Sequence, residues 1–86
     1  MSEEGIATQL LQESIGKNVL VKLKGRRSVR GKIKGFDKQM NIVITEAIEI
    51  IEHPSNNNGP DKDQDQESQV GDALIRGDNV ITIAVL

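Results

Sequence analysis

The spacing of apolar residues predicts one short helix followed by a set of strands. Ile6, Leu10 and Leu11 recur at the three- and four-residue spacing of a helix, with polar residues between them. Gly16 follows at a position suited to a C-terminal cap, where a left-handed backbone ends a helix. We therefore expect a helix over about residues 5–14. Because so short a helix is unstable alone, it must pack on another apolar surface.

Beyond Lys17 the apolar residues alternate with polar ones, which is the pattern of half-buried strands. The third of these segments is long, and we expect it to bend near Ala47. The last two segments form short strands about a tight turn at Gly77 and Asp78. Five segments carry the alternation: NVLVKLK, SVRGKIKGF, MNIVITEAIEIIE, DALIRG and NVITIAV.

Two glycines in the second strand predict the shape of the sheet. Gly31 and Gly35 fall on the face that also carries Val29 and Ile33, and this face is the buried one. Glycine weakens a flat strand but permits sharp bending and close approach of another backbone. We therefore expect a mainly β protein, in which the helix lies on a strongly bent, five-stranded antiparallel sheet that forms a small open barrel.

Residues 53–72 interrupt this pattern. The segment contains both prolines of the chain and three consecutive asparagines, and Val70 is its only apolar residue before the next strand. This composition is typical of an exposed loop. We therefore predict an acidic loop over residues 53–72.

Length and composition limit the possible functions. Eighty-six residues allow one domain with a small aliphatic core, and we treat residues 1–86 as that domain. The chain has no cysteine, which excludes disulfides and thiolate metal sites, and one histidine, His53, which lies in the polar segment. No apolar run is long enough for a membrane helix, and no signal-peptide pattern is present. We therefore expect a non-enzymatic, cytoplasmic protein without metal or cofactor, and no membrane partner.

The charges are strongly segregated along the chain. Residues 17–38 contain nine lysine and arginine residues and one acid, a net charge of +8, whereas residues 46–72 contain eight acids and one lysine, a net charge of −7. A polyanion responds to the local field and not to the net charge of the whole chain. We expect Arg26, Arg27 and Arg30 to contribute to a non-specific phosphate-binding surface. The alternative is a solvated basic surface without a partner.

Two polar clusters carry the remaining candidate chemistry. One is Asp37-Lys38-Gln39-Met40-Asn41, and the other is Arg76-Gly77-Asp78-Asn79. In a curved sheet of five strands both turns can lie at the same end. An amide can pair with the edge of a base, a guanidinium can stack on its plane, and a carboxylate can hold either in place. Turns rich in Asp and Asn also occur for structural reasons alone.

With these residues the chain resembles the Sm-like (LSm) proteins, and in particular their archaeal type. Residues 15–52 are similar to the first Sm motif of that family, and residues 73–85 are similar to the second. The recognisable positions of the first motif are Gly31, Phe36, Asp37, Met40 and Asn41. The resemblance implies a helix on a bent five-stranded barrel, the Sm fold.

The resemblance also implies assembly and a ligand. In that family the fourth strand of one subunit pairs with the fifth strand of the next, which gives a ring, usually of seven subunits. Uridine-rich single-stranded RNA binds at the inner rim of the pore, and the ring serves as a scaffold or chaperone in RNA metabolism. A bacterial Hfq-like hexamer is a related alternative, but residues 73–85 follow the Sm pattern.

The resemblance assigns roles to the residues of both clusters. Asn41, beside Met40, would read the uracil edge, and Arg76 would stack on the base. Asp37 and Asp78 would orient them, and Gly77 would let the backbone come close. Gln39 departs from the family pattern, because that position is commonly histidine or an aromatic residue and a flat amide stacks less well. The alternative function is therefore a structural ring that acts mainly through protein partners and binds RNA weakly.

Overall fold

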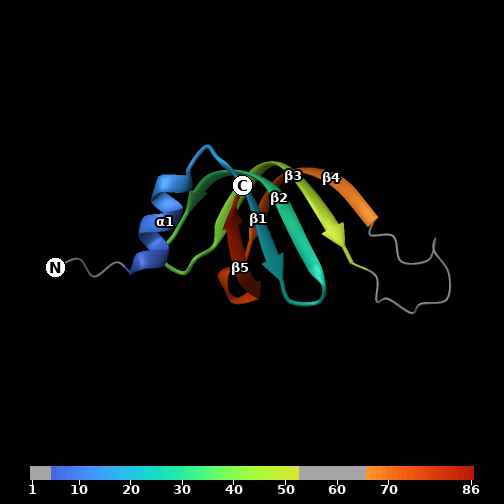
Figure 1. Cartoon of the computed structure of the whole chain (residues 1–86). Coiled ribbons are helices and arrows are strands. Elements are labelled where there is room, and N and C mark those ends of the chain that lie inside the picture. Colours follow the sequence, from blue (N-terminus) through green and yellow to red (C-terminus); the bar gives the residue numbers. More distant parts are fainter. Residues whose placement is uncertain (1–4, 53–65) are drawn as a thin grey trace.

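The computed structural model describes residues 5–52 and 66–86, which form one helix and an arched five-stranded sheet (Figure 1). The predicted loop is described only from Gln66 onward, and His53 lies outside the described residues. The elements are α1 (Ile6–Ser14), β1 (Asn18–Leu23), β2 (Arg27–Phe36), β3 (Ile42–Ile51), β4 (Gln66–Ile75), a 3₁₀ turn (Gly77–Asn79) and β5 (Val80–Val85).

All pairings in the sheet are antiparallel, and the strand order is β4-β3-β2-β1-β5. The tight turn predicted between the last two strands is present as the 3₁₀ turn Gly77–Asn79. However, β4 and β5 lie at opposite edges of the sheet and do not pair with each other as a hairpin would. Each of these strands therefore has one edge without a partner strand among the described residues.

The predicted bend of the sheet is confirmed, because the paired strands β2 and β3 arch together (Figure 1). The register between these strands shifts after Arg30, and the pairing of β3 with β4 shifts on both sides of Ala47. Glu46 takes a left-handed backbone conformation at this bulge, with φ of 53°. Bulges bend a strand and increase its twist, so the two long strands arch instead of lying flat.

Gly31 allows the arch to close tightly over β3. A Cβ atom at this position would overlap the Ile44 side chain and would lie 2.7 Å from the carbonyl oxygen of Thr45. Real Cβ atoms do not approach other atoms so closely, and the neighbours here include rigid backbone. The predicted reason for a glycine on the buried face, close approach of another backbone, is therefore confirmed for Gly31. It is not confirmed for Gly35, where a Cβ would meet no atom within 4 Å.

The core lies beneath the arch and is aliphatic, as the composition predicted. Alternate residues of β1 and β2 contribute to it, together with Leu11 of the helix, so the period-two pattern marks the buried face correctly. Phe36, the only aromatic residue, packs against this core while half-buried. The buried apolar residues are Leu11, Val19, Val21, Leu23, Val29, Ile33, Ile42, Ile44, Ala47 and Ile75.

The helix is confirmed, but its apolar side is only partly covered. Leu11 is buried, whereas Ile6 is 85% exposed and Leu10 is 43% exposed. The helix ends as predicted, because Gly16 has a φ of 86° and the N–H of Lys17 donates to the Ser14 carbonyl. The N–H of Gly16 also donates to Ile33 of β2, which ties the end of the helix to the sheet.

The predicted extent of the acidic loop is wrong at its C-terminal end. Residues 66–72 belong to β4, which begins at Gln66 and pairs with β3 as far as Ile51. Nearly all the side chains of this segment are exposed, so no apolar alternation marks it as a strand. The backbone groups along the edge of β3 require hydrogen-bond partners whatever the side chains are, and β4 supplies them.

Candidate nucleic-acid interface

The first candidate turn connects β2 to β3 and is organised by the Asp37 carboxylate. Its Oδ1 atom accepts hydrogen bonds from the backbone N–H groups of Gln39 and Asn41, both at 3.0 Å. The backbone adds two more, from Met40 N–H to Asp37 and from Asp37 N–H to Asn41. Asp favours turns because its side chain can accept from the backbone two or more residues further on. The local sequence is therefore sufficient to build this turn.

The same carboxylate also holds the side chain of Asn41. Its Oδ2 atom accepts a hydrogen bond from Asn41 Nδ2 at 3.0 Å. This bond, with those from the backbone of Asn41 and Gln39, lowers the pKa of Asp37 below its usual value, because each favours the charged carboxylate. Asp37 is therefore ionised at neutral pH, and Asn41 is held with its Nδ2 atom toward that charge.

The second candidate turn connects β4 to β5. The N–H of Asn79 donates to the Arg76 carbonyl oxygen at 3.0 Å, which closes the turn. Arg76 Nη2 lies 3.8 Å from Asp78 Oδ2, and both side chains are about two-thirds exposed, at 68% and 71%. Such an exposed pair contributes little stability, but it biases where the guanidinium lies. Arg76 therefore remains available to contact a ligand.

The two turns lie together, as the sequence predicted, and Asn41 joins them. The N–H of Gly77 donates to Asn41 Oδ1 at 2.8 Å, across 36 residues of sequence. A Cβ atom at Gly77 would overlap the carbonyl oxygen of Gln39 and would lie 2.9 Å from the carbonyl carbon of Met40. Only glycine fits this contact. The sequence analysis missed the Asn41–Gly77 hydrogen bond, and no local pattern in the chain signals it.

Not every residue of the predicted site offers a free side chain. Gln39 and Arg76 are exposed, whereas Met40 is half-buried and packs against the core with a left-handed φ of 67°. Met40 therefore anchors the turn to the core. Asn41 keeps one N–H of its amide and one lone pair of its Oδ1 atom beyond the two hydrogen bonds it makes. The amide thus presents one donor and one acceptor in a fixed orientation.

Residues 5–52 and 66–86 contain neither a candidate metal site nor a helix that could span a membrane. These residues contain no group of three or more His, Cys, Asp or Glu side chains that could hold a metal ion. No helix in this part of the chain is long and apolar enough to cross a membrane.

Comparison with known proteins gives one consistent result. A sequence profile of the LSM domain matches residues 9–85. An snRNP Sm-like protein of Methanococcoides burtonii is 35% identical over 75 residues, which cover 87% of this chain and 89% of the relative. Among solved structures, the Sm protein of Pyrococcus abyssii in complex with a uridine heptamer has a TM-score of 0.71 and 30% identity, covering 96% of this chain and 100% of that one. The P. aerophilum SmAP1 heptamer has a TM-score of 0.74 and 32% identity, covering 96% of both chains.

Proposed function

The chain belongs to the LSM-domain family of Sm and Sm-like proteins, and we propose that it is the subunit of a ring that binds uridine-rich single-stranded RNA. The ring acts as a scaffold or chaperone in RNA metabolism. The observation that carries this proposal is the link between the two turns through Asn41. The similarity to an Sm protein solved with a uridine heptamer supports the choice of ligand.

Base recognition rests on the amide of Asn41. Its free N–H and its free lone pair complement the acceptor and donor that lie side by side on the edge of uracil. The hydrogen bonds to Asp37 and Gly77 prevent the amide from turning over, so the order of donor and acceptor is kept. The exposed side chains of Gln39 and Arg76 are available to stack on the faces of a base bound in this position. Met40 anchors the turn that carries Gln39 and Asn41 to the core, and Asp78 biases the position of Arg76.

Ring formation rests on the unpaired edges of β4 and β5. An exposed strand edge can pair with another strand, and head-to-tail pairing of identical subunits closes into a ring when the rotation permits. The similarity to the P. aerophilum heptamer supports seven subunits. Repetition of one small site around the ring would raise the affinity for a long RNA by avidity.

A second candidate function follows from Gln39. A planar amide gives less stacking than an aromatic ring, and stacking contributes about 1–3 kcal/mol per base. If that loss is not offset by avidity, the ring would act mainly through protein partners and bind RNA weakly. The two functions differ in whether Asn41 controls the affinity for RNA.

The proposed role is binding and not catalysis, and we place it in the cytoplasm. The sequence has no cysteine and a single histidine, so it offers few of the side chains that act as nucleophiles or bases. The absence of cysteine also suits a reducing compartment. We propose that residues 1–86 act as one Sm-like domain, since the LSM profile spans residues 9–85.

The proposed function is tested by titrating the protein with oligouridine and with oligoadenosine of equal length. We expect a preference for oligouridine, and we expect Asn41→Ala to remove it, at a cost of roughly 1–3 kcal/mol per recognised base. Gln12→Ala, an exposed substitution on α1, serves as the control. Equal affinities for both RNAs in the unmodified protein, or an unchanged preference in Asn41→Ala, would contradict RNA recognition by this turn.

A further inference from the structure

The basic residues of β1 and β2 separate into two groups once their ion pairs are known. Arg27 Nε donates to Glu49 Oε2 at 2.9 Å, and Lys22 Nζ lies 3.8 Å from Glu52 Oε2. Each of these two cations therefore has a carboxylate close by that offsets part of its charge, most directly at Arg27, which the sequence analysis included in a phosphate-binding surface. Within the described residues no carboxylate oxygen lies within 4.0 Å of the basic groups of Lys17, Arg30, Lys32 and Lys34.

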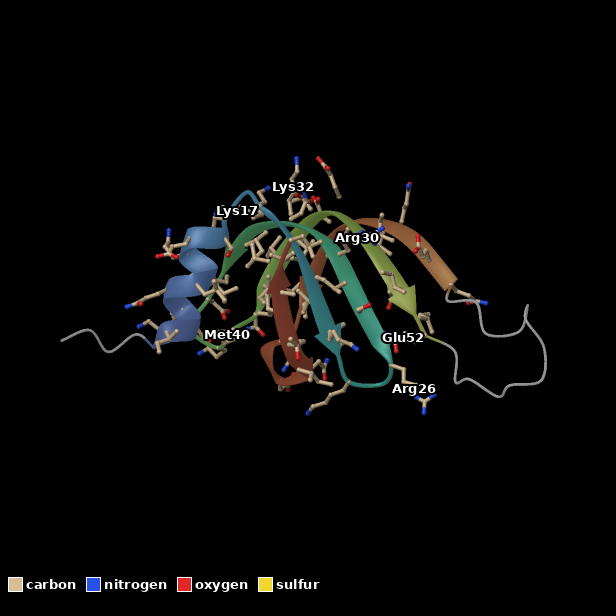
Figure 2. All side chains as sticks on the ribbon, in the orientation of Figure 1. Lys17, Arg26, Arg30, Lys32, Met40 and Glu52 are labelled. Carbon is tan, nitrogen blue, oxygen red and sulfur yellow. The ribbon has the colours of Figure 1, made fainter. Side chains whose placement is uncertain are left out.

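We call these four residues the outer basic row. Arg30, Lys32 and Lys34 lie on the side of β2 that faces away from the core, and Lys17 immediately precedes β1. Arg30, Lys32 and Lys34 alternate along β2 with the buried Gly31 and Ile33. Figure 2 shows Lys17, Arg30 and Lys32 along the crest of the arch. A strand rises about 3.4 Å per residue, so the three cations of β2 span roughly 14 Å, long enough to contact more than one phosphate of a nucleic acid.

The residues directly opposite Arg30 and Lys32 in the neighbouring strands do not supply counter-charges. Opposite Arg30 in the sheet stand Leu20 of β1 and Ile48 of β3, both apolar, and the residues opposite Lys32 are uncharged as well. Arg30 is half-buried between its apolar neighbours, so its aliphatic stem is covered and its position is restricted. The acid in the bulge of β3, Glu46, is exposed and forms no ion pair in the described part of the chain.

The outer basic row is distinct from the turns that hold Asn41. In Figure 2 Met40, which belongs to the first turn, lies at the lower end of the arch beside α1, whereas Arg30 and Lys32 lie along the crest. We propose that the outer basic row binds the phosphate backbone of RNA without regard to base sequence, as a second contact surface beyond the base-binding turns. The proposal rests on the proposed function only in naming RNA as the polyanion.

The composition of this surface indicates which part of RNA it contacts. Lysine and arginine neutralise phosphates, and such contacts carry no sequence information. Phe36 is the only aromatic residue of the chain and packs against the core, so the row has no aromatic side chain on which a base could stack. RNA is favoured over an acidic protein or an anionic membrane, because an RNA already held at the turns is present at high effective concentration.

The test compares two double variants that each remove one lysine and one arginine from β1 and β2. Arg30→Gln with Lys32→Gln removes charges of the outer basic row, and Lys22→Gln with Arg27→Gln removes charges that are already paired. Affinity for a long oligouridine is measured from low to high salt. Each lost phosphate contact should reduce the slope of log K against log salt by about 0.7. We expect a flatter slope for the first variant, and an unchanged slope for the second.

Two further measurements separate this proposal from the proposed function. Oligoadenosine binding is measured in the Asn41→Ala background, where base recognition is absent, and we expect the outer basic row still to set its salt dependence. Native mass confirms that both double variants keep the assembly of the unmodified protein. Equal slopes in both double variants would overturn the proposal. A row that binds only acidic proteins or anionic vesicles would give this result too. If the unmodified protein shows no preference for oligouridine but the slopes differ as expected, base recognition by the turns is contradicted and the proposal for the outer basic row stands.

Discussion

At the scale of single residues, Asn41 is the group on which the candidate site depends. One end of its amide donates to Asp37, and the other end accepts from the Gly77 backbone. The carboxylate of Asp37 thus determines which way the amide faces, although Asp37 need not touch RNA. Asp37 is a positioning residue in this arrangement. Its charge state should therefore control RNA binding through Asn41.

This arrangement predicts a specific pH dependence. Because the folded-state pKa of Asp37 is lowered, its ordering effect is complete above the usual pKa of aspartate and is lost as pH falls through the lowered value. Affinity for oligouridine, measured by fluorescence titration, should be constant between about pH 7 and about pH 5 and decline only at more acidic pH.

Asp37→Asn should bind oligouridine more weakly at neutral pH, because its neutral side chain accepts hydrogen bonds less strongly, and should lose most of the acid-dependent decline. Glu13→Gln, which removes an exposed acid of α1, serves as the control and should behave like the unmodified protein. A decline of equal size in Asp37→Asn would show that another group is responsible.

At the scale of elements, the arch of β2 and β3 decides where the two turns lie. The bulge at Glu46 and Ala47 bends β3, and Gly31 lets β2 come close to it. The strands β4 and β5 can therefore lie at opposite edges of the sheet and still be joined by a three-residue 3₁₀ turn. A flat sheet would hold these edges too far apart for so short a connection.

The two glycines of β2 provide a matched test of this geometry. Gly31→Ala should destabilise the protein by about 1–3 kcal/mol, since its Cβ would overlap Ile44 and the β3 backbone. Gly35→Ala, where a Cβ meets nothing within 4 Å, should change stability by less than about 0.5 kcal/mol. Urea unfolding at equal protein concentration measures both. Similar losses in the two variants would mean that the close approach at Gly31 is not what limits substitution.

At the scale of the whole molecule, the two sheet edges expose apolar side chains that a single copy leaves in water. Leu74 of β4 is 66% exposed, and Ile81 of β5 is 62% exposed. Both strands also have an edge without a partner strand among the described residues. Pairing of these edges between copies would bury the side chains and satisfy the backbone. Self-association is thus part of how we expect so small a core to be stabilised.

Leu74→Lys should weaken this assembly, because it places a charge where the apolar edge of β4 would meet another copy. We expect native mass spectrometry to show smaller particles than the unmodified protein gives, and a lower affinity for long oligouridine as avidity is lost. The control is Gln12→Lys, on the exposed side of α1, which should leave the particle mass unchanged. An unchanged particle mass in Leu74→Lys would contradict the involvement of this edge.

Features that depend on local patterns could be predicted from the order of residues alone. The spacing of Leu10 and Leu11 with the cap at Gly16 predicted the helix, and alternation predicted β1, β2 and the bent β3. The two polar clusters and the motifs around them indicated the family and the candidate turns. Each of these signals lies within a few neighbouring residues, where backbone preferences and side-chain period act directly.

Features that depend on partners distant in sequence became visible only in the folded protein. The start of β4 at Gln66 follows from the edge of β3, whose backbone accepts a strand of polar residues as readily as one of apolar residues. The link from Asn41 to Gly77 spans 36 residues. The pairing of Arg27 with Glu49, which distinguishes Arg27 from the outer basic row, follows from the register of β2 on β3. Hydrogen bonds and ion pairs depend on distances in space, and residue order alone does not specify those distances.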